Sequence, residues 1–202
     1  MEMRIATGPE PLIWVLHDGN AGNVRQAMAL AKAVAARTGG QVTEIALGLR
    51  PPLHLLPAWG WALGGARAGG WPFTGLSEGA AALEPPWPAL VIGCGRRVAP
   101  FTAAIRKLGG AKAVQILAPQ MPLGAFDAVI APRHDGLTGG TVIETLGALN
   151  DLDAATIDAE SARWARRLAH LPEPRVAVLV GGASRSADFG AQTLQRLSDA
   201  LT

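Results

Sequence analysis

One stretch that could do chemistry lies at residues 18–23, DGNAGN, between an apolar run and a helix-forming run. Glycine lets the backbone approach a ligand, and the free N–H groups of a helix N-terminus suit an anion or a network of sugar hydroxyls. The stretch lacks the G-x-G-x-x-G pattern, and Asp18 argues against a pyrophosphate at this place. A turn in which Asp18 or Asn20 caps the helix explains the same residues equally well.

A second stretch, GCGRR at residues 93–97, also follows an apolar run. Its glycines suit a tight turn, and Arg96 and Arg97 at the end of a strand could bind phosphate or carboxylate. Arginines at such a place can equally be solvated. We expect Cys94 to be a small buried residue rather than a nucleophile, because no activating base is evident beside it.

A histidine beside a carboxylate, His134 with Asp135, is the third candidate. Histidine changes charge near neutral pH, which suits a general base, although Asp135 could instead only cap the loop. The remaining histidines, His17, His54 and His170, lack such a neighbour and are expected to be structural or solvated.

Residues 181–184, GGAS, again precede a helix-forming run. The backbone N–H groups of Gly181 and Gly182, together with the Ser184 hydroxyl, would form a conventional phosphate cradle. A nucleotide pyrophosphate is therefore expected here rather than at Asp18.

These loops must be positioned by short apolar strands that alternate with helices, a pattern typical of a parallel sheet with crossover helices. The sequence thus predicts an α/β fold, a Rossmann-like parallel sheet with flanking helices. Strand-end loops of such a sheet face one crevice, so we expect Asp18, Arg96, His134 and Gly140 around one pocket. The expected strands cover residues 12–17, 41–47, 89–93, 113–117, 128–131 and 175–180, and the expected helices cover residues 24–36, 98–108, 153–171 and 188–201. Residues 141–149 suit a short helix or an edge strand. In the helix at 153–171, the residues expected to face inward are Ala155, Ile157, Ala162, Ala165 and Leu168.

Residues 50–88 break this alternation, because seven prolines and four tryptophans interrupt them. Long loops with one or two short helices are expected. Tryptophan prefers the headgroup region of a membrane, so residues 53–61 could touch lipid. Such stretches more often belong to the core, which is the expectation here.

The composition of the 202 residues excludes several classes of protein. With 49% hydrophobic and 17% charged residues, the chain is too apolar for disorder. One cysteine excludes internal disulfides and cysteine zinc sites, and a net charge of +2 without tyrosine gives no nucleic-acid footprint. With no apolar run long enough to span a membrane and no signal peptide at the start, a cytoplasmic protein is expected.

Taken together, these stretches resemble the mitochondrial fission protein family named after elongated mitochondria, whose bacterial members are described as glycosyltransferases. The resembling segments are residues 18–26, 91–97, 114–117, 126–132, 134–135, 140–149 and 178–184. The resemblance implies a GT-B-like architecture, in which the first of two Rossmann-like domains holds the acceptor and the second the nucleotide-sugar. Enzymes of this architecture use helix dipoles and basic side chains in place of a metal, so no metal or separate cofactor is expected.

We therefore expect an acceptor-side domain at residues 1–171 and, at 172–202, the incomplete start of a nucleotide-sugar-binding domain. The expected function is sugar transfer from a nucleotide-sugar to an envelope glycan or lipid-linked acceptor, with this short form inactive or impaired. The alternatives are an interaction or membrane-docking module of the same fold and a nucleotide-sugar epimerase. A second copy of the chain could cover the unfinished second domain. The expected catalytic residues are Asp18, His134 and Asp135; the nucleotide-binding residues are Gly181, Gly182 and Ser184; the substrate-binding residues are Gly19, Asn20, Gly22, Asn23, Gln26, Gly93, Gly95, Arg96, Arg97 and Gly140. The expected location is the cytoplasm, with peripheral contact to the inner face of the membrane.

Overall fold

The computed structural model describes residues 10–179 and 190–201. The chain forms two compact units, residues 1–152 (unit 1) and residues 153–202 (unit 2). The domain boundary expected between residues 171 and 172 stays a prediction.

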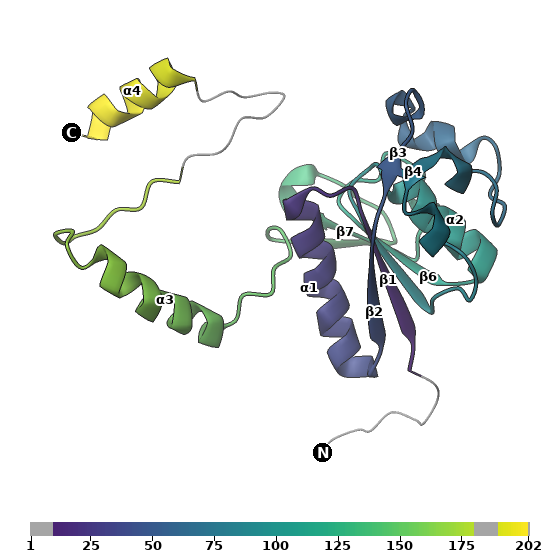
Figure 1. Ribbon diagram of the computed structural model, residues 1–202, viewed down its shortest axis with the longest axis horizontal. Helices are drawn as coiled ribbons and strands as arrows, with labels where there is room; N and C mark the ends of the chain where they lie inside the picture. Colours follow the sequence, from purple (N-terminus) through teal and green to yellow (C-terminus); the bar gives the residue numbers. More distant parts are fainter. Residues whose placement is uncertain (1–9, 180–189, 202) are drawn as a thin grey trace. The chain divides into compact units, whose positions relative to one another are not determined.

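Unit 1 is built on a sheet of six strands in the order β2-β1-β5-β6-β7-β8 (Figure 1). Every neighbouring pair in this sheet is parallel. The strands are β1 (Leu12–His17), β2 (Gln41–Ala46), β5 (Leu90–Cys94), β6 (Lys112–Ile116), β7 (Ala128–Pro132) and β8 (Val142–Thr145), with helix α1 (Ala21–Thr38) after β1 and helix α2 (Ala99–Gly109) after β5. The predicted α/β, Rossmann-like fold is confirmed.

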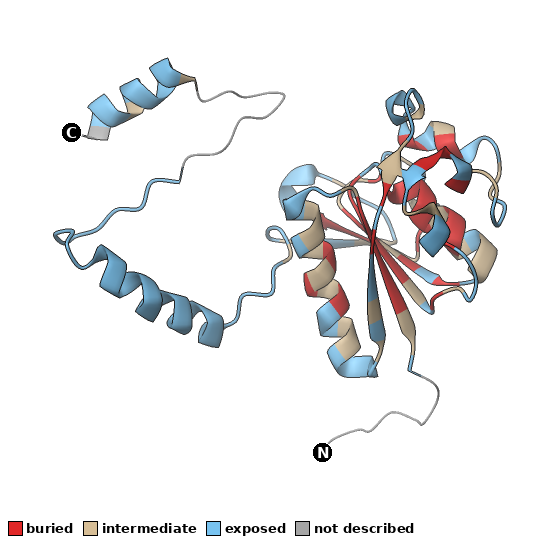
Figure 2. Cartoon of the chain, in the orientation of Figure 1, coloured by how far each residue is buried: buried red, intermediate tan, exposed pale blue. Residues whose placement is uncertain are grey.

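The central strands contribute to two cores, because successive side chains point to opposite faces of a sheet. Ile13 and Val15 of β1 pack with Ala27 of α1 on one face. Trp14 packs on the other face, in the cluster that holds Phe101 of α2. Figure 2 shows the resulting layer of buried strands at the centre of unit 1. This arrangement fixes the strand ends, and with them the loops that carry the candidate residues.

The predicted strands and helices of unit 1 agree with the structure to within a few residues. Residues 141–149 contain the edge strand β8 rather than a helix. Helix α1 begins at Ala21, three residues before the expected start. The reason is local: the side chain of Asn20 accepts a hydrogen bond from the backbone N–H of Gly22 at 3.0 Å and so caps the helix.

The segment from 50 to 88 contains only short elements, and its tryptophan rings pack directly against glycines. It contains the four 3-10 turns η1 (Leu53–Leu55), η2 (Ala58–Ala62), η3 (Phe73–Gly75) and η4 (Ala80–Ala82), while β3 (Gly48–Leu49) pairs antiparallel with β4 (Leu76–Glu78). A Cβ added to any of three glycines would overlap an indole ring. The pairs are Gly64 with Trp71, Gly75 with Trp61, and Gly109 of α2 with Trp87. The absence of a side chain at these glycines therefore provides the space that the tryptophan rings occupy.

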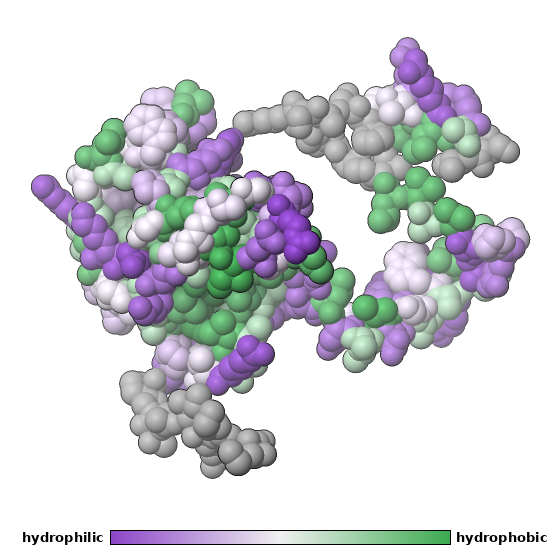
Figure 3. Space-filling model, turned by 180° about the vertical axis from the view of Figure 1, so that it is seen from behind, coloured by the Kyte–Doolittle hydropathy of each residue, from purple (hydrophilic) through white to green (hydrophobic). Residues whose placement is uncertain are grey.

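The expectation that residues 53–61 belong to the core is confirmed for Trp61, which is 3% exposed. It is wrong for Leu55, Leu56 and Trp59, which are exposed. In short 3-10 turns, neighbouring side chains point in different directions, so one segment supplies both core and surface. Figure 3 shows unit 1 from behind, where apolar side chains gather over a broad area bordered by polar ones.

Unit 2 contains α3 (Ala154–Leu168) and α4 (Ala191–Leu201). The expected helix at 153–171 is shorter than predicted, and its five expected inward-facing residues are exposed, as is every residue of α3 (Figure 2). The expected strand at 175–180 is also wrong where the structure describes it, because residues 175–179 have no regular structure. An isolated strand without a hydrogen-bonded partner is not stable. Residue 180 lies outside the described residues.

Candidate functional site

The carboxyl ends of β1 and β5 meet at the topological switch point of the sheet. After β1 the chain passes through α1 to β2 on one side, whereas β5, on the other side of β1, leads through α2 to β6. Ligands of open α/β sheets bind in the crevice at such a point. Both helices begin at this edge, so the partial positive charges of two helix N-termini meet there.

Asp18 follows β1 and is half-buried. Its Oδ1 atom accepts hydrogen bonds from the side-chain amide of Asn23 at 3.0 Å and from the backbone N–H of Asn20 at 3.3 Å. Its Oδ2 atom has no hydrogen bond with any residue in the described ranges. Asn20, not Asp18, caps α1. Asp18 is therefore held through Oδ1, and its Oδ2 can accept a further hydrogen bond.

The first turn of α1 and the loop after β5 approach each other closely at Asn23 and Gly95. A Cβ on Gly95 would come 2.7 Å from the Asn23 amide nitrogen, and the φ of Gly95 is 89°, so glycine is required. The buried Gln115 of β6 donates to the Gly95 carbonyl at 3.0 Å. Gln115 was missed in the sequence, although a polar residue inside an apolar strand was a usable signal. These contacts fix the loop after β5 against β6 and against the start of α1.

Arg96 and Arg97 lie between β5 and α2, and both are exposed. Neither makes an ion pair with a residue that the structure describes. The first turn of α2 has no acidic residue, and its N-cap, Val98, makes no side-chain cap. Two free guanidinium groups beside an uncapped helix N-terminus favour an anion at this place.

Cys94 is a buried residue, as predicted. Burial, together with the negative charge of Asp18, raises the pKa of its thiol to about 12. A thiol in that state is not a nucleophile near neutral pH.

His17 orders the start of the first loop. It is buried, its Nδ1 accepts a hydrogen bond from the backbone N–H of Gly19 at 3.1 Å, and its Nε2 lies 2.9 Å from Oε1 of Glu44. The expected structural role of His17 is confirmed, and Glu44 is a partner that the sequence analysis missed. The other two histidines without a carboxylate neighbour, His54 and His170, are exposed as expected.

His134 and Asp135 lie in the 3-10 turn η6 (Arg133–Asp135) after β7, with His134 Nε2 3.6 Å from Asp135 Oδ1. Three strand steps separate β1 from β7, which at ~4.8 Å a step puts His134 about 14 Å from Asp18. The two residues therefore lie at separate points along the carboxyl ends of the strands, and no contact joins them among the described residues.

Gly140 lies at the other end of the strands, away from Asp18. It precedes β8, and the register that pairs Val142 with Val129 sets it at the amino end of β7, while the preceding Gly139 is the residue that lies beside Leu123 of η5 (Leu123–Ala125). The expectation that Gly140 shares a pocket with Asp18 was wrong, because the connection from β7 returns along the full strand length before β8 begins.

The remaining candidates fall into two groups. Gly19 and Gly22 belong to the loop and helix start beside Asp18, and the Gln26 side-chain amide donates to the Gly22 carbonyl at 3.4 Å. Gly93 is buried against Thr102 and Gln115. Gly181, Gly182 and Ser184 lie outside the described residues.

The switch-point site thus offers one carboxylate oxygen, side-chain amides, two free guanidinium groups and two helix N-termini. This donor and acceptor set suits hydroxyl groups next to an anion. Across residues 10–179 and 190–201, no group of three or more histidine, cysteine or acidic side chains could hold a metal ion. Over the same ranges, no helix has the length and apolar character needed to cross a membrane.

Comparison with known proteins gives two matches. A family model described as "Mitochondrial fission ELM1" matches residues 21–202. Over 139 aligned residues, the chain is 32% identical to the mitochondrial fission protein ELM1 of Arabidopsis thaliana. The alignment covers 56% of this chain and 33% of that protein. The chain therefore spans about a third of the length of this relative. No solved structure matches the chain.

Proposed function

The chain belongs to the mitochondrial fission ELM1 family, and from this premise we propose that it serves sugar transfer from a nucleotide-sugar to an acceptor of the cell envelope. The observation that carries the proposal lies at the switch point, where Asn23 of α1 donates to Asp18 after β1 and lies against Gly95 after β5. This crevice would hold the acceptor, either an envelope glycan or a lipid-linked sugar.

Asp18 is the proposed general base. A transfer needs a group that takes the proton from the acceptor hydroxyl, and its free Oδ2 can do so while Asn23 and the Asn20 N–H hold Oδ1. Arg96 and Arg97 would bind a phosphate or carboxylate of the acceptor. His134 and Asp135, about 14 Å away along the sheet edge, would contact a second sugar of a longer acceptor.

The donor side of the proposal rests on Gly181, Gly182 and Ser184. Their backbone N–H groups and hydroxyl would hold the diphosphate of the nucleotide-sugar without a metal. Nucleotide-sugar epimerisation would use the same groups, and it differs in leaving the sugar on its nucleotide.

Calorimetric titration of the chain tests both sides. A hexose phosphate should bind, and a double variant R96A/R97A should weaken it about tenfold or more, whereas the exposed Arg37→Ala should leave it unchanged. A nucleoside diphosphate should bind and be weakened by Gly182→Val. If neither class of compound binds, or if R96A/R97A binds hexose phosphate like the wild type, the proposal is wrong.

A membrane-docking function is the second candidate, and one observation favours it. Leu55, Trp59 and Leu63 are 75%, 56% and 79% exposed within eight residues of one another. Side chains of this kind insert at the headgroup boundary of a bilayer. On this second proposal, the protein lies in the cytoplasm and contacts the inner face of the membrane through these side chains.

Sedimentation with lipid vesicles tests this second candidate. The triple variant L55S/W59S/L63S should lose most of the vesicle-bound fraction. The matched control Leu146→Ser removes an equally exposed leucine, 85% exposed, from the loop after β8 and should retain it. Equal binding by both variants would exclude this surface.

A further inference from the structure

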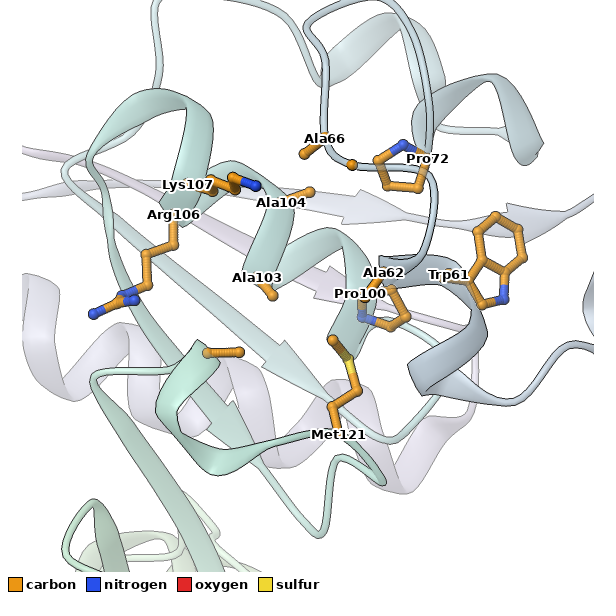
Figure 4. A pocket seen from close by; sticks show the side chains of 12 residues that line it. Trp61, Ala62, Ala66, Pro72, Pro100, Ala103, Ala104, Arg106, Lys107 and Met121 are labelled. Carbon is orange, nitrogen blue, oxygen red and sulfur yellow. The ribbon is translucent and has the colours of Figure 1, made fainter.

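Unit 1 contains an apolar pocket away from the switch point. It has a volume of about 300 Å³ and lies between α2, the segment with η2, and the loop that leads into η5 (Figure 4). Its lining includes Trp61, Pro72, Ala103 and Met121, and the only charged residues among those that line it are Arg106 and Lys107. None of these residues belongs to the crevice proposed for sugar transfer.

Trp61, which lines this pocket, is held in place by Trp71 behind it. Trp61 and Trp71 stack with ring centroids 4.8 Å apart and an interplanar angle of 11°. The indole N–H of Trp71 also donates to the Trp61 carbonyl at 2.7 Å. Pro100 and Ala103 of α2 supply the facing wall. The pocket is therefore largely formed before any ligand arrives, as ligand pockets usually are.

The two cations at its rim differ. Arg106 is bound to Asp127, with its Nε 2.8 Å from Asp127 Oδ2. Lys107 makes no ion pair with any residue that the structure describes. In Figure 4 the Lys107 ammonium group points toward Ala66 and Ala104, whereas the Arg106 guanidinium is turned away. A single available positive charge thus stands beside an apolar hollow.

We propose that this pocket binds the alkyl chain of a small anionic amphiphile whose carboxylate or phosphate pairs with Lys107. At the roughly 30 Å³ that one water occupies in the liquid, the pocket has room for about ten non-hydrogen atoms. Octanoate has this size. The proposal does not depend on sugar transfer, because it concerns binding at different residues.

Titration of the full chain with octanoate below its micelle concentration, followed by calorimetry and amide chemical shifts, tests the proposal. Octanoate should bind with a dissociation constant below about 1 mM and shift the amides of α2. Octanol and octyltrimethylammonium should bind at least about fivefold more weakly, because they lack the charge that pairs with Lys107. The chain should extract octanoate from phosphatidylcholine vesicles that contain it. Vesicles without octanoate should not shift the α2 amides. The two results together distinguish a free amphiphile from the bilayer as the source of the ligand.

Two variants locate the site. Lys107→Glu should weaken octanoate about fivefold or more at low salt, while Arg37→Glu, a reversal at another exposed cation, should not. Ala103→Trp fills the pocket and should abolish binding, while Ala33→Trp on the exposed side of α1 should not. Circular dichroism confirms that each variant is folded. Absence of octanoate binding, equal binding of octanol, or unchanged binding by a folded A103W would each overturn the proposal.

Discussion

Replacing Asp127 with asparagine should destabilise unit 1 by about 1 kcal/mol at neutral pH and by almost nothing at pH 2. Asp127, the residue before β7, joins helix α2 and strand β6 at the amino end of the sheet. Its Oδ2 accepts from Arg106 of α2 at 2.8 Å and from the backbone N–H of Ala113 in β6 at 2.9 Å, while Lys112 lies 3.4 Å from Oδ1. Asparagine keeps an acceptor for Ala113 and removes the charge that Arg106 requires.

The hydrogen bond from Arg106 is the largest of the effects that lower the pKa of Asp127 to about 2. A shift of this size from an unfolded value near 3.9 corresponds to roughly 2 to 3 kcal/mol. Solvent screens the pair, because the Asp127 and Arg106 side chains are 26% and 38% exposed, and we expect about half of that figure or less. The folded pKa is the lower one, so this contribution is complete above about pH 5, declines as the pH falls below 3.9, and is lost below about 2.

Urea unfolding followed by tryptophan fluorescence at pH 7, 4, 3 and 2 measures the effect. The gap in unfolding free energy between wild type and D127N should be largest at pH 7 and close by pH 2. Asp151→Asn is the control, because Asp151 pairs with Lys32 where both side chains are exposed, and its gap should be much smaller. A gap for D127N that stays constant between pH 7 and 2, or that equals the control's, would refute the reasoning.

Three further predictions test the site's framework. Cys94 should resist a thiol reagent in the folded chain at pH 8 and react on unfolding, because its pKa is raised to about 12; rapid labelling of the folded chain would contradict this. Gly93→Ala should cost at least about 2 kcal/mol in urea unfolding, since its Cβ would overlap the Thr102 hydroxyl, whereas Gly124→Ala, with open space around it, should be nearly neutral; equal effects would show that the interior yields. Asn20→Ala should lower the unfolding free energy by about 1 kcal/mol through loss of the α1 cap, while Asn20→Asp should retain it; a neutral alanine variant would contradict the capping role.

The sheet of unit 1 was predictable because its strands are short apolar runs that end in glycine or polar turns. Residues 12–17, for example, read LIWVLH and form β1. Unit 2 was harder, because periodicity shows which face of a helix is apolar but not what covers it. Ile157 and Leu168 have the expected spacing in α3, yet both are exposed. A strand at 175–180 likewise needs a partner that a local pattern does not supply.

The candidate site was predictable to the extent that it follows strand ends. Asp18 and Arg96 lie at one edge because they follow parallel neighbouring strands. Gly140 does not, since the direction of its connection depends on where β8 begins. Gln115 and Glu44 support the loops from strands β6 and β2, and only the register shows which loop each one reaches.

The packing of tryptophan rings against glycines restricts how this sequence can change in evolution. A mutation that enlarges Gly75 is blocked as long as Trp61 stands against it, and the same holds for Gly109 with Trp87. Loss of the indole would remove the block. Among relatives of this chain, the two members of each pair should therefore change together, with a larger residue at the glycine position appearing where the tryptophan has become small. Paired replacement of this kind would identify relatives that keep the fold of residues 50–88 even where the prolines of that segment have changed.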